Sequence, residues 1–412
     1  MSSMKTLILS LLVLGTIWHS GQSAPTDQDQ SLSIQNSIAK LNGVFAKFIK
    51  DDLKPEQNAL FSPLNIYTAL SLLNLGTSGE TRKELSNVLG TPADEAGLSA
   101  AQNYFAKILN DLQTSDAAEV KVANTVFVQK GLKLKDSYLQ ASKNYYQSEA
   151  QQVNFAKGGS EATDLVNNWV SANTKNRIPK LFKEPLSQAM SLLLVSALFF
   201  NATWQQPFNK GETKNEKFNT GLKQVEVPLM SQKKYVSYFK NNDSTVEAIV
   251  LPYKNGEFNM LVVLPHQNLS VGAVIDAYRP AFHQRLLHGG ANWKNEYVDY
   301  KIPFLKYGWS QSINNHVIKA GITKIFGSAE LDNLVENASN LQVSDITHAA
   351  EIEVDEDGTV ATAVTSIGIS RTSVERRPEP IKFYVDRPFI ISIYHQKTGA
   401  ILFSGIIQNP SV

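Results

Sequence analysis

The residue types that usually carry catalysis form no recognisable pattern in this chain. Its 412 residues include no cysteine, which excludes a thiol nucleophile, a disulfide framework and a thiolate metal site. The seven histidines are scattered, and we interpret the one close pair, His283 and His288, as surface residues. The sequence contains no G-x-S-x-G, G-x-G-x-x-G, H-E-x-x-H or Walker motif. We therefore predict that the protein is not an enzyme and holds no metal or cofactor.

The most informative segment is residues 351–388. An acidic stretch (EIEVDEDG, 351–358) leads into thirteen residues without charge or proline (GTVATAVTSIGIS, 358–370), and a basic stretch (RTSVERRPEP, 371–380) follows. In a strand, one face of this run would begin with small side chains and end with larger ones: Thr359, Ala361, Ala363, Thr365, Ile367 and Ile369. The alternation fits an ordinary core strand, whereas the polar flanks favour an exposed loop.

The rest of the chain supplies the elements that must position this segment. Apolar periodicity predicts helices at residues 32–50, 63–76, 99–112 and 165–174. β-Branched and aromatic runs predict strands at residues 120–129, 191–200, 246–252, 258–265, 297–303 and 389–394. Early helices followed by many strands indicate an α+β fold, and no linker or repeat divides the chain.

Composition restricts the class of protein further. The chain is 42% hydrophobic and carries a formal net charge of +1, from 39 Lys and Arg against 38 Asp and Glu. Such a chain can bury a large core, and it lacks the basic footprint of a nucleic-acid-binding protein. The longest basic cluster is a pair, such as Arg376 and Arg377. We expect a globular protein with no nucleic-acid partner.

The N-terminus has the layout of a secretory signal. Lys5 precedes an apolar run at residues 6–18, and small residues lead to Ser23, after which we predict cleavage; cleavage after Ala24 is the alternative. A membrane anchor is the competing interpretation, although the run is about seven residues short of a bilayer span. Four glycan acceptor sites fit a secreted, extracellular glycoprotein: Asn201, Asn242, Asn268 and Asn337. We expect a signal peptide at 1–23 and one domain at 24–412.

Several longer motifs, in order, resemble the serpin family of serine protease inhibitors. They include NALFSPLNIYTALSLLNLG (58–76), FFNATWQQPF (199–208), LPYKNGEFNMLVVLP (251–265) and FYVDRPFIISI (383–393). The resemblance implies a monomer of one α+β domain, with three β-sheets, about nine helices and an exposed reactive loop at about 356–380. It also implies a suicide substrate: a protease cuts the loop, and the freed arm inserts into the main sheet before the acyl-enzyme hydrolyses.

The resemblance assigns roles to two groups of residues. It makes the following residues the hinge of the loop: Glu356, Gly358, Thr359, Ala361 and Ala363. It places a second group at the point where the main sheet opens: Trp204, His348, Ser62, Asn65 and Ser196. Here the chain departs from the family pattern, since Ser196 replaces a usual Asn and Asn65 a usual Ser. We hypothesise that the amide and the hydroxyl have exchanged places around His348.

The residue before the scissile bond has two main candidates. The usual family register gives Thr372, with Ser373 after it, whereas a loop one residue shorter gives Arg371 followed by Thr372. Chemistry favours Arg371, because a trypsin-like pocket binds guanidinium through a bidentate carboxylate contact. Thr372 would imply an elastase-like target. Arg376 remains an alternative, and Pro378 argues against Arg377.

Two further questions concern partners. A non-inhibitory serpin acting as a carrier or chaperone is the main alternative to an inhibitor of serine proteases. Heparin-activated relatives carry several Lys and Arg on the helix near residues 97–111, where this chain has only Lys107. We therefore expect no heparin activation at that helix.

Overall fold

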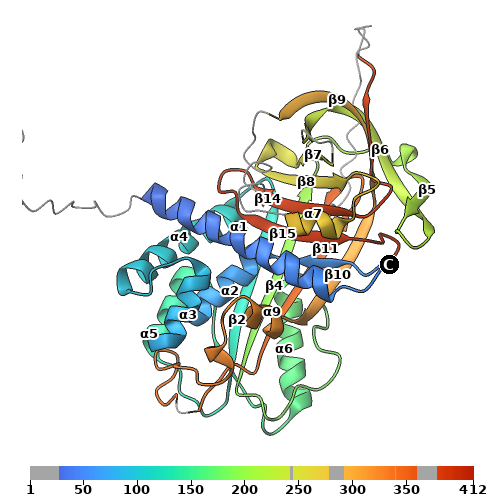
Figure 1. Cartoon of the computed structure of the whole chain (residues 1–412). Helices are drawn as coiled ribbons and strands as arrows, with labels where there is room; N and C mark the ends of the chain where they lie inside the picture. Colours follow the sequence, from blue (N-terminus) through green and yellow to red (C-terminus); the bar gives the residue numbers. More distant parts are fainter. Residues whose placement is uncertain (1–26, 242–244, 278–291, 339, 360–377) are drawn as a thin grey trace, which may run out of the picture.

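We analysed a computed structural model of the whole chain, which describes residues 27–241, 245–277, 292–338, 340–359 and 378–412. The predicted signal peptide, Asn242 and the loop residues Ala361, Ala363, Arg371, Thr372 and Ser373 lie outside the described residues. The described part contains two hydrogen-bonded sheets and eight α-helices (Figure 1). No helix in it is both long and apolar enough to span a bilayer.

The six-stranded sheet holds the start of the segment singled out above, at residues 351–354 and 358–359. Its strand order is β10 (Leu305–Ser312), β11 (Asp345–Val354), β12 (Gly358–Thr359), β4 (Leu192–Thr203), β2 (Glu119–Gln129) and β3 (Gln151–Val153). In β4 nearly every residue is buried, because helices and strands cover both faces of this central strand. Strand β4 also pairs directly with β11 over part of its length.

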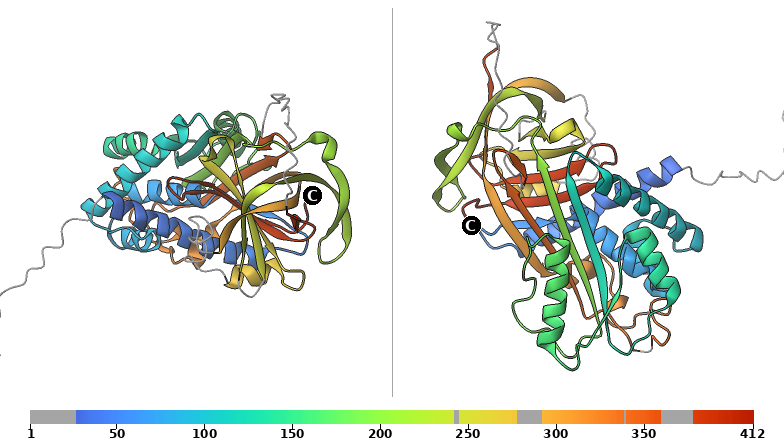
Figure 2. Two further views of the ribbon diagram at one scale, coloured as in Figure 1. Left: turned by 90° about the horizontal axis from the view of Figure 1, so that it is seen from above. Right: turned by 180° about the vertical axis from the view of Figure 1, so that it is seen from behind.

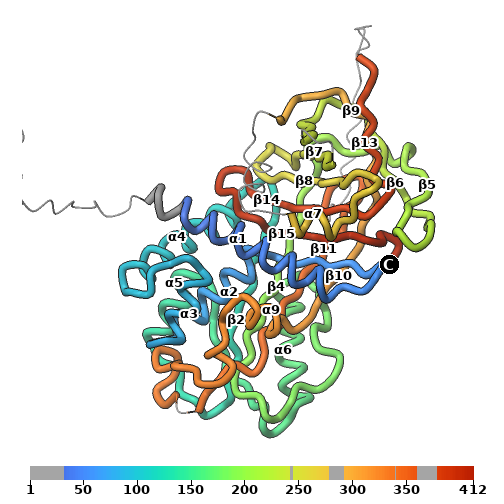
Figure 3. Tube along the Cα trace, in the orientation of Figure 1, coloured from blue at the N-terminus to red at the C-terminus, as the bar shows by residue number. Residues whose placement is uncertain are grey.

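The nine-stranded sheet packs against the first and carries the C-terminus. Its order is β1 (Ala59–Phe61), β15 (Ile401–Ile407), β14 (Phe389–His395), β8 (Phe258–Pro265), β7 (Val246–Pro252), β6 (Gln224–Lys240), β9 (Trp293–Pro303) and β13 (Ile381–Tyr384), with β5 (Lys214–Asn219) on β6. The trace in Figure 3 shows β14 and β15 between α1 and β8. The described strands therefore form two sheets where the resemblance implied three. Two of the expected sheets are joined into one because β6 is long enough to pair with β5, β7 and β9.

Most helices gather at one end of the molecule. They are α1 (Asp27–Asp52), α2 (Pro63–Leu75), α3 (Gly79–Leu89), α4 (Glu95–Thr114), α5 (Asp136–Tyr146), α6 (Gly159–Asn173), α7 (Val271–Ala277) and α9 (Asn314–Lys319), with 3-10 turns at Lys210–Glu212, Lys254–Gly256 and Lys324–Phe326. Every residue of α2 is buried, as its all-round apolar sequence requires. Of the described helices, α6 is the one that covers the outer face of the six-stranded sheet, as Figure 2 shows from behind.

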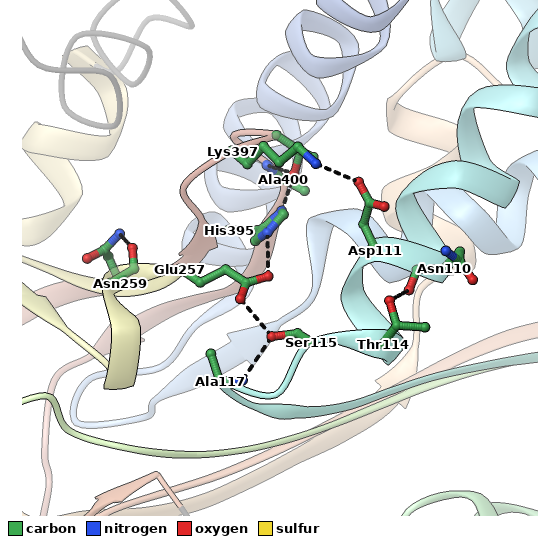
Figure 4. A network of polar contacts seen from close by, with 12 residues as sticks. Asn110, Asp111, Thr114, Ser115, Ala117, Glu257, Asn259, His395, Lys397 and Ala400 are labelled. Carbon is green, nitrogen blue, oxygen red and sulfur yellow. Dashed lines mark hydrogen bonds and ion pairs between the residues drawn. The ribbon is translucent and has the colours of Figure 1, made fainter.

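A polar network joins the end of α4 to the turn between β14 and β15 (Figure 4). Glu257 accepts a hydrogen bond from the Ser115 hydroxyl at 2.9 Å and lies 3.3 Å from Nε2 of His395. The Nδ1 atom of His395 lies 2.8 Å from the Thr398 hydroxyl. Burial lowers the pKa of His395, while Glu257 opposes that shift. The network satisfies a buried imidazole and fixes the helical layer to the sheet.

Candidate functional site: a slot between two strands

The predicted loop begins inside the six-stranded sheet, between β4 and β11. These strands pair in parallel from Asp345 opposite Leu193 to Ala350 opposite Leu198. Beyond that point β12 lies between them, with Thr359 opposite Val354 on one side and Ala202 on the other. We call the strip between β4 and β11 the slot, and residues 199–201 and 351–353, where direct pairing ends, its mouth.

The registers around the slot agree with one another. In the parallel pairing, each β11 residue is 152 positions beyond its β4 partner (345 − 193). The two residues that flank Thr359 differ by the same 152 positions (354 − 202). Strand β12 is antiparallel to both neighbours. A strand that continued β12 could therefore pair with both sides without any sliding of β11 along β4.

A tight turn delivers the chain from β11 into β12. The Asp355 carboxylate accepts hydrogen bonds from the backbone N–H groups of Asp357 and Gly358, at 2.8 and 2.9 Å. The Trp204 backbone N–H donates to the Asp357 carbonyl at 2.9 Å, and the Phe208 N–H donates to the Glu356 carbonyl at 2.8 Å. The Asx-type turn and these bonds hold the predicted hinge against the end of β4.

Two residues of the predicted hinge fit their positions closely. A Cβ atom on Gly358 would meet the Ala202 carbonyl oxygen at 2.1 Å and the Thr203 Cα at 2.6 Å, so only glycine allows this approach. Thr359 is 1% exposed, and its hydroxyl lies 2.6 Å from the Tyr253 hydroxyl. Thr359 therefore points into the core. Burial raises the pKa of Tyr253, so its hydroxyl stays protonated.

The predicted tryptophan stands beside the hinge. Trp204 stacks on Tyr253 with ring centroids 4.4 Å apart and planes 11° apart. Its indole N–H donates to the Asp355 carbonyl at 2.9 Å. The ring is 4% exposed, so this hydrogen bond lies in a region of low water access. Trp204 thus fixes the turn through its side chain as well as through its backbone.

His348 links β11 to β4 and to the start of α2. Its Nε2 accepts a hydrogen bond from the Ser62 backbone N–H at 2.9 Å, which leaves the proton on Nδ1. Nδ1 lies 3.0 Å from the Ser196 hydroxyl across the directly paired part of the slot. Burial lowers the pKa of His348 to about 3, so the ring is neutral. This neutral ring is the polar connection between the inner faces of the two strands.

The expected exchange of amide and hydroxyl holds at one position only. Ser196 contacts His348 directly, whereas the Asn65 side chain accepts from Asn124 Nδ2 at 2.6 Å and its own Nδ2 has no hydrogen-bond partner. Asn65 reaches His348 through Ser62, the N-cap of α2, whose hydroxyl accepts from the Asn65 N–H at 3.1 Å. The amide cannot replace the hydroxyl because α2 directs it towards β2.

The described acceptor asparagines lie in different surroundings. Asn268 and Asn337 are exposed in connections between elements. Asn201 is half-buried near the end of β4, opposite Glu119. Within the described ranges, no group of three or more His, Asp or Glu side chains could hold a metal ion.

One comparison decides the family of this chain. The family model described as Serpin (serine protease inhibitor) matches residues 43–410. The chain belongs to the serpin family. Among curated relatives, Iripin-2 of Ixodes ricinus is 31% identical over 410 residues, covering 98% of each chain. The family predicted from the sequence motifs is therefore confirmed.

Solved structures of other serpins share this fold. Mouse protein-Z dependent protease inhibitor is 27% identical, with a TM-score of 0.81 and coverage of 93% of this chain and 99% of that one. Human thyroxine-binding globulin, solved in complex with thyroxine, gives a TM-score of 0.82 at 24% identity, covering 92% of this chain and 99% of that one. The second likeness concerns the fold alone. The predicted α+β serpin fold is confirmed.

Sequence reasoning missed several residues of the site. Strand β11 escaped it because its acidic end, EIEVDEDG, looked like a loop flank. Tyr253 and Asn124 are separated from their partners Thr359 and Asn65 by 106 and 59 positions. The alternation of apolar and polar residues at 350–354 (AEIEV) is the one signal that could have predicted β11.

Proposed function

We propose that this serpin is a secreted inhibitor of trypsin-like serine proteases, which it traps by inserting the cut reactive loop into the slot. The observation that carries the proposal is the position of β12. Gly358 and Thr359 already pair with both sides of the slot, and the matching registers allow the same strand to continue. Insertion then needs separation of β4 from β11 and no other rearrangement of the ladder.

The register predicts the neighbours of each inserted residue. Extending β12 places residue 361 opposite Phe200 and residue 365 opposite Ser196, with His348 on its other side. The same count brings residue 369 opposite Leu192, where β4 begins. The slot therefore has room for residues 358–369, the first twelve of the thirteen residues in the uncharged run.

The inward face of the run suits this slot. Because Thr359 points into the core, Ala361, Ala363, Thr365, Ile367 and Ile369 would follow on the same face. The small side chains of Ala361 and Ala363 offer little steric obstruction to entry between β4 and β11. The trailing isoleucines would lie beside Leu194 and Leu192, which belong to the main core. Burying each isoleucine contributes about 1.5–3 kcal/mol to insertion.

The hydrogen bond between Ser196 and His348 crosses the path of insertion. It must break when β4 and β11 separate, and Thr365 would then stand between the two residues. The threonine hydroxyl can accept from His348 Nδ1–H in the new position. The exchange keeps the buried imidazole satisfied both before and after insertion.

The length of the slot supports Arg371 as the residue before the scissile bond. Arg371 follows the last residue that the slot accommodates by two positions, so the bound protease would be carried to the far end of the sheet. A guanidinium side chain fits the carboxylate pocket of a trypsin-like protease. Cleavage between Thr372 and Ser373 remains the alternative and would imply an elastase-like target.

Secretion is a part of the proposal that rests on the sequence. The charged and apolar start of the chain and the exposed acceptor residues Asn268 and Asn337 support export through the glycosylating pathway. Mass spectrometry of the protein from the medium of expressing cells tests this. We expect an N-terminus at residue 24 or 25 and glycan mass on at least one acceptor residue; a full-length intracellular product would contradict it.

Mixing the protein with trypsin tests the inhibitory function. An inhibitor gives a covalent band of summed mass on a denaturing gel, and the released C-terminal fragment should begin at Thr372. An elastase-like protease tests the alternative bond in the same way: a covalent band with a released fragment that begins at Ser373 would favour that bond. Quantitative cutting without a covalent band would contradict inhibition and would favour a non-inhibitory serpin that acts as a carrier or chaperone.

A further inference from the structure

The turn that follows α6 has an unusual backbone. Lys175 and Asn176 both adopt left-handed conformations, with φ of 51° and 62°, which non-glycine residues rarely do. The Asn176 N–H donates to the Ser171 carbonyl at 2.8 Å, and the Ser171 hydroxyl donates to the Asn176 side chain at 2.7 Å. These bonds to the last turns of α6 hold the left-handed pair in place.

The charged residues of this turn bind opposite sides of the slot. Lys175 Nζ lies 2.5 Å from a carboxylate oxygen of Glu119 on β2, and 6.0 Å from the ring centroid of Phe199 on β4. Arg177 donates to Glu353 on β11 at 2.7 Å. Two positions of one turn therefore connect the β2–β4 side of the sheet to the β11 side.

These contacts lie over the mouth of the slot. Ala350 and Leu198 form the last direct pair between β11 and β4, and β12 fills the gap only from Val354 and Ala202 onward. Phe199 and Glu353 lie in the interval between these two levels. Their side chains are on the outer face, because successive residues of a strand face opposite sides and their chain neighbours, Phe200 and Ile352, belong to the inner core. The turn after α6 covers that face.

The Arg177–Glu353 contact is an ionised pair. Glu353 is partly buried, and burial favours a higher pKa, but hydrogen bonds from Arg177 and Lys306 outweigh this effect and lower its pKa. Lys306 lies 3.3 Å from the other carboxylate oxygen and comes from β10, directly opposite Glu353. Lys306 therefore binds the same carboxylate as Arg177 without crossing the mouth.

We propose that Lys175 and Arg177 form a clasp across the mouth of the slot, and that release of this clasp limits the rate of loop insertion. The inference rests on the proposed function. In the extended register, residue 360 would stand between Asn201 and Glu353, and residue 362 between Phe199 and Glu351. Both side chains would face outwards, on the side that the clasp occupies. The turn must therefore lift before Val360 and Thr362 can enter.

Peptide insertion into the uncut protein tests the clasp without a protease. A synthetic peptide with the sequence of residues 360–370, which follow the strand already in place, is incubated with the full chain. Its incorporation is followed as a shift in native-gel mobility and a rise in melting temperature. We expect Arg177→Gln to take up the peptide about two- to five-fold faster than the wild type, as the loss of one ion pair predicts. Lys175→Gln should act in the same direction, and Arg177→Lys should retain the slow rate.

Lys306→Gln is the matched control, because it removes a cation from the same carboxylate on one side of the slot only. Its insertion rate should equal that of the wild type. Equal acceleration by Arg177→Gln and Lys306→Gln would overturn the clasp in favour of a general charge effect, and an unchanged Arg177→Gln would overturn it outright. A wild type that takes up the peptide but forms no adduct with trypsin would refute the proposed function while still testing the clasp. A wild type that never takes up the peptide contradicts the slot and the clasp together.

Discussion

Replacing Ser196 with alanine should weaken the uncut protein more than the cut protein. In the uncut form the Ser196 hydroxyl is 3.0 Å from His348 Nδ1, and both residues are fully buried. The ring cannot turn to another partner, because its Nε2 already accepts from the Ser62 N–H. Ser196→Ala therefore leaves a buried N–H group without an acceptor, at a cost of about 1–3 kcal/mol.

The cut form should lose much less. The extended register places Thr365 between β4 and β11 at the level of His348, where its hydroxyl can accept from Nδ1–H. We expect Ser196→Ala to lower the free energy of unfolding of the cut form by less than about 1 kcal/mol, which is within the range of a single neutral hydrogen bond. In the proposed mechanism insertion converts the first form into the second, so the variant should also take up its own cut loop more readily.

Urea unfolding of both forms, with and without the substitution, measures the difference. Ser142→Ala is the matched control: this serine is also fully buried, but it donates to the Leu139 carbonyl within α5, far from the slot. The control should destabilise both forms equally. If Ser196→Ala lowered the free energy of unfolding of the uncut and cut forms equally, Thr365 would not replace the hydrogen bond between Ser196 and His348. The predicted register of insertion would then be wrong.

Three further changes test other parts of the reasoning. Gly358→Val puts a side-chain Cβ 2.1 Å from the Ala202 carbonyl oxygen. We expect the protease still to cut the loop, while the yield of covalent adduct on gels falls about tenfold for each 1.4 kcal/mol that overpacking adds to the barrier to insertion. Arg371→Ala should slow adduct formation with trypsin about a hundredfold, since two charge-assisted hydrogen bonds are lost; an unchanged rate would exclude Arg371. His348 has a folded pKa of about 3, below the usual 6.5, so the unfolded state binds more protons between these values. The contribution of His348 to the free energy of unfolding is therefore present above pH 6.5 and is lost as the pH falls towards 3, by up to about 1.4 kcal/mol per pH unit. Urea unfolding at a series of pH values measures this loss, and His348→Gln should lack it.

Local sequence patterns predicted those elements that bury a regular apolar face. The strands at 246–252 and 258–265 match β7 and β8, and the helix predicted from Pro63 to Gly76 matches α2 within one residue. In α2 the proline at the first turn and the apolar sequence on all sides leave little choice of structure. Strand β6 was missed because its seventeen residues include many exposed polar side chains and because its longest pairing is with β9, which lies far along the chain.

The sequence by itself determined the family and the thirteen-residue run that is small and uncharged enough to enter a sheet, because composition and alternation are local properties. Tertiary structure alone decided the register in which we propose that this run pairs. The equal offset on both sides of Thr359 depends on the register of three strands, and the pairing of Arg177 with Glu353 joins residues 176 positions apart. Such contacts form only when the packed core brings distant segments together, so no local pattern encodes them.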